Sequence, residues 1–122
     1  MEPMSDASAK DSDDLVLVSI EAWKFIRLLQ RAVSRLEPSE QARYVSQARF
    51  FQKKIDGVLE ARGIRLESIE GHPFEPGLAA TALNSDEFVE GDRALFIAQM
   101  IEPIVIGPEG VIKTGTFILG AV

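Results

Sequence analysis

The stretch GHPFEPGLAATALNSDEF, residues 71–88, separates two kinds of sequence pattern. Upstream of it, apolar residues recur every three or four positions, which is the spacing of helices that bury one face. Downstream, short runs rich in Val, Ile and Phe alternate with Gly and Pro, which is typical of strands joined by turns. Within the stretch, Phe74 stands between Pro73 and Pro76, and each proline restricts the backbone beside it. The stretch therefore predicts a junction, with Phe74 buried where helices and strands meet.

The pattern upstream of the junction predicts two helices with a break between them. Pro38 ends the first helix, because it lacks an amide hydrogen and clashes with the preceding turn. Ser39 is the expected N-cap of the second helix, and Gly63 is its expected left-handed C-cap. Each helix repeats apolar residues at alternating three- and four-residue intervals, the spacing of a helix–helix seam. Residues 15–69 therefore predict an αα-hairpin, in which Leu15–Val18 fit either a first helical turn or a short strand.

The hairpin carries more apolar surface than two helices can cover between themselves. Trp23, Phe25 and Leu28 widen the apolar face of the first helix beyond its seam. Large exposed apolar patches usually mark interfaces, and two hairpins pack into a four-helix bundle that covers such patches. We therefore expect a homodimer. Its expected interface residues are Ala22, Ile26, Leu29, Val33, Leu36, Phe51 and Ile55.

The remaining segments complete an α+β fold. Residues 1–14 are small, polar and acidic and predict a disordered tail. Residues 70–85 predict the junction followed by a short Ala-rich helix. Residues 86–122 predict a small antiparallel β module, in which Pro103 separates two strands and Gly107–Gly110, with the sequence GPEG, forms a turn. The expected fold is thus an N-terminal αα-hairpin that forms a four-helix bundle on dimerisation, followed by a β module.

Composition argues against several classes of function. The chain of 122 residues has a net charge of −6, which disfavours binding to nucleic acid, because that requires a basic footprint. The same charge disfavours an anionic membrane surface. Without cysteine, the chain has no disulfide and no thiol nucleophile. This composition fits a reducing compartment, and we expect a cytoplasmic protein.

The polar motifs do not form a catalytic constellation. His72 is the single histidine, and no nucleophile is placed with it in the sequence. Asn84–Glu87 groups two carboxylates, but a turn or capping role explains them better than acid–base chemistry. No Gly-rich phosphate-binding motif occurs. We therefore expect no enzymatic activity, no metal and no cofactor.

The junction and the motifs after it resemble the GrpE family, the nucleotide exchange factors of DnaK-type chaperones. The family has a Gly-x-x-Phe-Asp-Pro pattern at its junction. The matching residues here are Gly71, Phe74, Glu75 and Pro76, with Glu in place of Asp.

Two later motifs continue the resemblance in the same order. Asn84-Ser85-Asp86 and Glu90-Gly91 are similar to the Glu-Ser-Asp and Pro-Gly of the family. Glu109–Lys113 is similar to its Gly-Arg-Val-Leu-Arg. The sequence departs from the family at Ala79-Ala80, where a His-Glu pair is usual. It also departs in having no long N-terminal paired helix.

The resemblance implies a homodimeric co-chaperone that is not an enzyme. Such a protein binds the nucleotide-binding domain of a DnaK-type chaperone through its β module and opens the cleft, so that ADP leaves. Phe74 and Pro76 would hold the β module on the helices. The expected partner contacts are Lys113, Ile112, Phe96 and Ile104. The alternative is a self-assembling structural or adaptor protein that kept the fold without exchange activity, in which Phe96 and Ile104 are only core. Lys113 would then be only a charge at a strand edge, which guards against aggregation.

Overall fold

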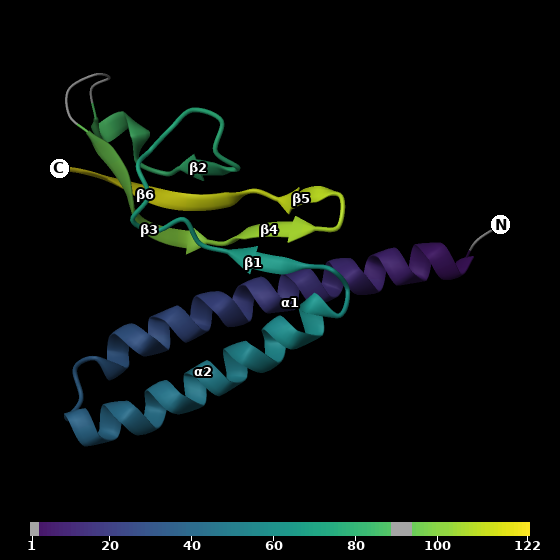
Figure 1. The fold of residues 1–122 in the computed structure, drawn as a ribbon, viewed down its shortest axis with the longest axis horizontal. Helices are drawn as coiled ribbons and strands as arrows, with labels where there is room; N and C mark the ends of the chain where they lie inside the picture. Colours follow the sequence, from purple (N-terminus) through teal and green to yellow (C-terminus); the bar gives the residue numbers. More distant parts are fainter. Residues whose placement is uncertain (1–2, 89–93) are drawn as a thin grey trace. The chain divides into compact units, whose positions relative to one another are not determined.

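The structure, a computed structural model, describes residues 3–88 and 94–122, with side chains given from residue 10 onward. It has an α+β fold in which two helices precede the strands (Figure 1). The chain divides into two compact units, Met1–Gly63 and Ile64–Val122. We call them the helical unit and the β unit.

The helical unit is an antiparallel pair of helices, α1 (Pro3–Val33) and α2 (Pro38–Glu60), which pack against each other (Figure 1). Leu15–Val18 lie inside α1, which settles the choice between helix and strand. The expectation of a disordered tail is wrong from Pro3 onward, while the first two residues lie outside the described part. Proline is well tolerated in a first helical turn, and adding residues to an existing helix costs little once it is nucleated.

The turn between the helices is closed by a side chain that the sequence reading missed. Two expectations for this turn are wrong: Pro38 does not end the first helix, since α1 already stops at Val33, and Ser39 is not the N-cap of α2, because α2 begins at Pro38 and Glu37 holds the N-cap position. Instead, Gln41 donates from Nε2 to two carbonyl oxygens that follow α1, at 3.1 Å to Ser34 and 2.7 Å to Leu36. Carbonyls at a helix C-terminus have no partner within the helix, so Gln41 satisfies groups that would otherwise depend on water.

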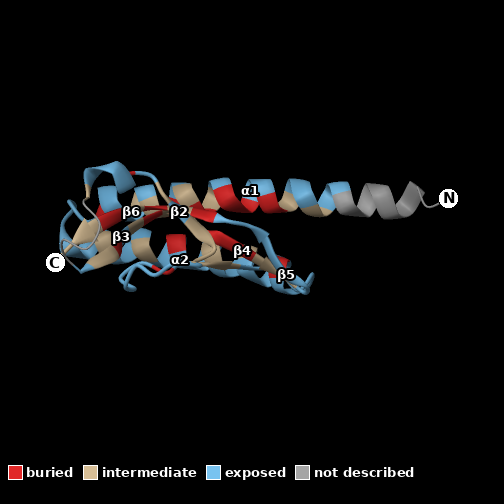
Figure 2. Ribbon diagram, turned by 90° about the horizontal axis from the view of Figure 1, so that it is seen from above, coloured by how far each residue is buried: buried red, intermediate tan, exposed pale blue. Residues whose placement is uncertain are grey.

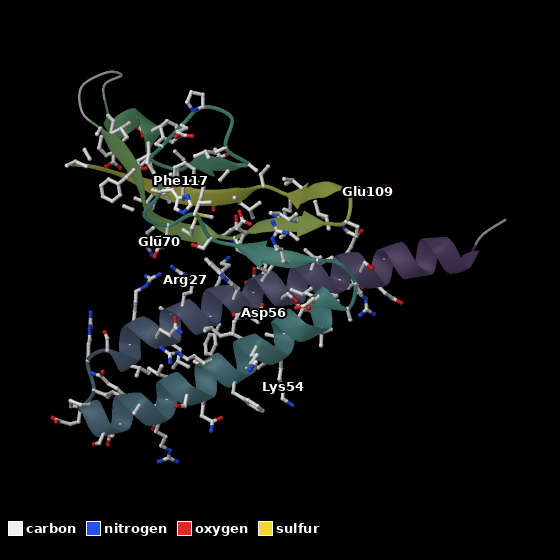
Figure 3. All side chains as sticks on the ribbon, viewed as in Figure 1. Arg27, Lys54, Asp56, Glu70, Glu109 and Phe117 are labelled. Atoms are coloured by element: carbon white, nitrogen blue, oxygen red, sulfur yellow. The ribbon has the colours of Figure 1, made fainter. Side chains whose placement is uncertain are left out.

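The first sheet of the β unit is antiparallel throughout, with strand order β1-β4-β5. Its strands are β1 (Arg65–Glu67), β4 (Ile104–Gly107) and β5 (Gly110–Lys113). The GPEG turn joins β4 to β5 as expected, with Gly107 paired to Gly110. In Figure 3, Glu109 marks this turn.

The second sheet is mixed, with strand order β2-β6-β3. Its strands are β2 (Ala80–Ala82), β3 (Leu95–Glu102) and β6 (Gly115–Ala121). The central strand β6 runs parallel to β2 and antiparallel to β3. The β unit is therefore not purely antiparallel. Pro103 separates β3 from β4, as the sequence predicts.

Two expected boundaries are corrected by strand pairing. β1 lies in residues 15–69, which were expected to be helical, so the helical unit ends at Gly63. β2 replaces the short helix expected within residues 70–85, and only a single turn of 3₁₀ helix follows, at Ser85–Glu87. Both strands are short, and each gains its hydrogen bonds from a strand more than thirty residues later in the sequence.

Buried residues lie in both units. In the β unit, Ile97, Val105 and Phe117 have no exposed surface, and Met100 and Leu119 are also buried. In the helical unit, α1 shows buried positions along one side and exposed positions along the other (Figure 2). The sheets place their apolar residues inward at alternate positions, as β6 illustrates from Gly115 to Leu119.

Candidate protein-binding surface

The junction stretch runs along β3 and is held there by backbone hydrogen bonds. The Gly71 N–H donates to the Ile97 carbonyl at 2.7 Å, and the Ile97 N–H donates to the His72 carbonyl at 2.9 Å. The Phe74 N–H donates to the Leu95 carbonyl at 3.0 Å. Gly71 has a φ of 88°, a conformation that glycine adopts without the steric cost of a Cβ atom. The junction is therefore part of the β unit.

Phe74 is not buried, in contrast to the sequence expectation. It is 39% exposed, and its ring packs on Phe117 with the centroids 5.9 Å apart and the planes tilted by 52°. Phe117 belongs to β6 (Figure 3). The backbone pairing with β3 fixes Phe74 at the surface of the β unit. The remaining matched residues, Glu75 and Pro76, are exposed.

The exposed strand β5 carries two of the four residues expected to contact a partner. It is an edge strand, since it is paired only with β4. All four of its residues are exposed, including Val111 at 50% and Ile112 at 48%. The pairing register shifts between Val105 and Ile106, so β5 has one extra residue there. Such a bulge twists an edge strand and redirects its side chains. Ile112 and Lys113 are thus accessible together.

The other two expected contacts do not join this surface. Ile104 is buried, with 4% of its surface exposed, so it offers nothing to a partner. Phe96 is half-buried and belongs to β3, in the other sheet. Its ring lies beside Gly120, where a Cβ atom would meet Phe96 Cζ at 2.9 Å. Both residues contribute to the packing of the β unit.

The residues expected at a dimer interface separate into two groups. Ile26 and Val33 are buried, and Ala22, Leu29 and Ile55 are half-buried. Their burial and spacing are typical of a seam between two packed helices. Leu36 and Phe51 are exposed, at 38% and 50%. The second group exposes the most surface to another chain.

The polar residues considered as candidates for chemistry are mostly exposed. His72, Asp86 and Glu87 are exposed. Asn84 is buried at 8% exposure, and its side chain bonds to the backbone of Leu119. Sequence reasoning expected a turn role for Asn84 and missed this bond, because the partner lies 35 residues away.

Within residues 3–88 and 94–122, the structure has no group of three or more His, Asp or Glu residues arranged to hold a metal ion. In the same ranges, neither helix contains a segment with the length and hydropathy needed to cross a bilayer.

Comparison with known proteins does not assign the chain to a family. No family model, no curated protein and no solved structure matches it.

Proposed function

We propose that this protein is a co-chaperone of the GrpE type, which binds the nucleotide-binding domain of a DnaK-type chaperone and promotes ADP release. The observation that carries the proposal is the exposed β5 strand, with Ile112 and Lys113 accessible at the position of the family's terminal motif. The order of a helical hairpin followed by a β unit agrees with the resemblance. The proposal places the protein in the cytoplasm.

The chemistry of β5 suits contact with a folded protein. Val111 and Ile112 supply apolar area, which stabilises association as it leaves water. Lys113 supplies a positive charge on a chain whose net charge is −6, so it favours a partner surface with an acidic group. Charge complementarity of this kind contributes mainly to specificity and to the association rate.

The proposed mechanism requires no chemical step. A protein that binds the open form of the chaperone more tightly than the closed form shifts the equilibrium toward the open form, and ADP then dissociates faster. The shift is limited by the difference between the two affinities. β5 would make its contacts only with the open form.

The test is the release of a fluorescent ADP analogue from the chaperone, with and without this protein. We expect acceleration by the native chain and a weaker effect of Lys113→Glu. Lys53→Glu is the matched control, because Lys53 is exposed on α2 and the change in net charge is the same. Equal loss in both variants, or no acceleration together with no detectable complex, would contradict the proposal.

A second candidate is a self-assembling structural or adaptor protein without exchange activity. It is favoured by the large apolar side chains that both helices expose, among them Phe25 at 61% and Phe50 at 58%. Such side chains are unusual on a surface that contacts only water. The exchange assay separates the candidates, because this one predicts self-association without faster ADP release.

A further inference from the structure

The middle of α2 is basic, although the chain as a whole is acidic. Residues 41–55 hold four basic residues and no acidic one, while the net charge of the chain is −6. The four are Arg43, Arg49, Lys53 and Lys54, and all of them are exposed. This segment therefore attracts negatively charged groups that the rest of the chain repels.

An exposed phenylalanine lies among these charges. Phe50 is 58% exposed. On a helical wheel it lies nearly opposite Ala48 and Leu59, the buried residues of α2. Its ring therefore points away from the buried side of the helix. In Figure 3, Lys54 leaves α2 on the side away from α1.

The neighbours of Phe50 on the helix surface are all basic or neutral. Residues three, four and seven positions apart share a side of a helix, and around Phe50 these are Arg43, Ser46, Gln47, Lys53, Lys54 and Gly57. Lys54 Nζ lies 5.0 Å from the centre of the Phe50 ring, which is within the range of cation–π attraction. We call Arg43, Phe50, Lys53 and Lys54 the basic patch.

The charges of this segment are poorly balanced within the helix. No acidic residue stands three or four positions from Arg49 or Lys54, which is the spacing of helical ion pairs. Arg49 and Lys53 are four positions apart, and like charges at this spacing repel each other. The nearest acid after them, Asp56, accepts a hydrogen bond from Gln52 Nε2 at 2.8 Å. An anionic group from another molecule would relieve the repulsion.

We propose that the basic patch binds a short acidic segment of another protein, which carries an apolar side chain among its carboxylates. The carboxylates pair with the cations of the patch, and the apolar side chain covers the Phe50 ring. Removal of this ring from water stabilises the complex. The charges select an acidic partner and speed its association.

The size of the patch favours a peptide segment over larger polyanions. From Arg43 to Lys54 the patch spans about 17 Å of helix. Acidic residues lie beyond both of its ends, with Glu40 before it and Asp56 and Glu60 after it. A short segment can lie on the patch without approaching these acids. A nucleic acid or an anionic membrane extends past them and is repelled, and each of these partners requires a larger basic footprint.

The basic patch is separate from the surfaces discussed above. All four of its residues belong to α2, whereas the proposed chaperone contact lies on β5. None of the four is among the residues expected at a dimer interface. The inference therefore requires neither exchange activity nor a particular oligomeric state.

The test is fluorescence anisotropy of a labelled acidic peptide, titrated with the full chain. The probe has about twelve residues, enough to cover the patch in a helical or an extended conformation. It carries leucine at its centre and glutamate elsewhere. We expect saturable binding that weakens as salt is raised, and no binding of the same peptide with glutamine in place of glutamate. A native chain that does not bind the acidic peptide, or that binds both peptides equally, would overturn the proposal.

Variants locate the binding site. Lys53→Glu and Phe50→Ser should each lower the affinity for the acidic peptide by at least about fivefold, while far-UV circular dichroism stays unchanged. Lys10→Glu is the control for charge, since Lys10 is exposed on α1. Phe25→Ser is the control for the ring, since Phe25 on α1 is 61% exposed. Controls that lose as much affinity as the patch variants would overturn the site.

The same assay separates the inference from the other candidates. Lys113→Glu, which should impair ADP release, should leave peptide binding unchanged, and Lys53→Glu should do the reverse. Vesicles of phosphatidylcholine and phosphatidylserine and a single-stranded poly-dT oligonucleotide serve as competing polyanions. If either bound more tightly than the peptide, and lost affinity in Lys53→Glu and Phe50→Ser, the patch would belong to that class of partner and the proposal would be overturned.

Discussion

The side chain of Asn84 pairs with the backbone of Leu119 as a neighbouring strand would. Its Oδ1 accepts a hydrogen bond from the Leu119 N–H at 2.8 Å, and its Nδ2 donates to the Leu119 carbonyl at 3.2 Å. The Leu83 N–H donates to the Phe117 carbonyl just before this point, at 2.8 Å. Asn84 therefore continues the pairing of β6 past Ala82, where β2 ends.

Replacing Asn84 by alanine should destabilise the β unit strongly. The change leaves the N–H and carbonyl of Leu119 without their partners in a buried place, and the expected loss is about 2–4 kcal/mol of unfolding free energy. Urea unfolding followed by circular dichroism measures it. Ser85→Ala, at an exposed neighbour, should change the free energy by less than about 0.5 kcal/mol. Equal effects of the two variants would contradict this role of Asn84.

Two glycines should respond to alanine in opposite directions. A Cβ atom at Gly115 would lie 2.7 Å from the Glu102 carbonyl oxygen and 3.1 Å from Met100 Cε. Gly115→Ala should therefore cost about 1–3 kcal/mol. A Cβ atom at Gly57, within α2, would meet nothing within 4 Å. Gly57→Ala should stabilise the helical unit by about 0.5–1 kcal/mol, because alanine favours the helix. Thermal unfolding of the two variants checks both signs.

The Phe74 ring should contribute moderately to stability. Because it is 39% exposed and contacts Phe117 at 5.9 Å, Phe74→Ala should cost about 1–2 kcal/mol, less than the loss of a buried ring. Phe74→Tyr keeps the ring and should be nearly neutral. Urea unfolding measures the change in unfolding free energy. If Phe74→Ala lowered it as much as the loss of a fully buried ring does, Phe74 would be packed more deeply than its 39% exposure indicates.

Gln41 should stabilise the turn between the helices. Gln41→Ala removes the donor to Ser34 and Leu36 and should lower the free energy of unfolding by about 0.5–1.5 kcal/mol. Gln47→Ala is the matched control, since Gln47 is exposed on the same helix. The melting temperature from circular dichroism compares the two. If Gln47→Ala lowered the melting temperature as much as Gln41→Ala, the hydrogen bonds of Gln41 would not be what stabilises the turn.

The helices were predictable because their determinants are local. The break between the helices lies next to Pro38, although Pro38 itself begins α2, and Gly63 adopts a φ of 72°, the left-handed conformation expected after a helix. The sequence also predicted the break at Pro103 and the GPEG turn. In each case, the residue that decides the structure lies within a few positions of its effect.

The strands β1 and β2 were not predictable, because their partners are distant in sequence. Two of the three residues of Ala80–Ala82 are alanine, which is depleted in strands, and the pairing with β6 overrides the helical preference of alanine. For the same reason, the burial of Ile104 and the exposure of Phe74 did not follow from the residue types. The exposed positions of Ile112 and Lys113 agreed with expectation, but exposure alone leaves their partner a proposal.

The position of β6 at the centre of its sheet sets an order of events during synthesis. The helical hairpin depends on contacts between segments close in sequence, which form quickly. The second sheet cannot form until Gly115–Ala121 is available, because β2 and β3 are joined to each other only through β6. While the ribosome still holds that segment, the emerged chain carries a formed hairpin together with the segments of β2 and β3, which lack their common partner. For this interval, the unfinished chain itself has the exposed strand edges that chaperones protect.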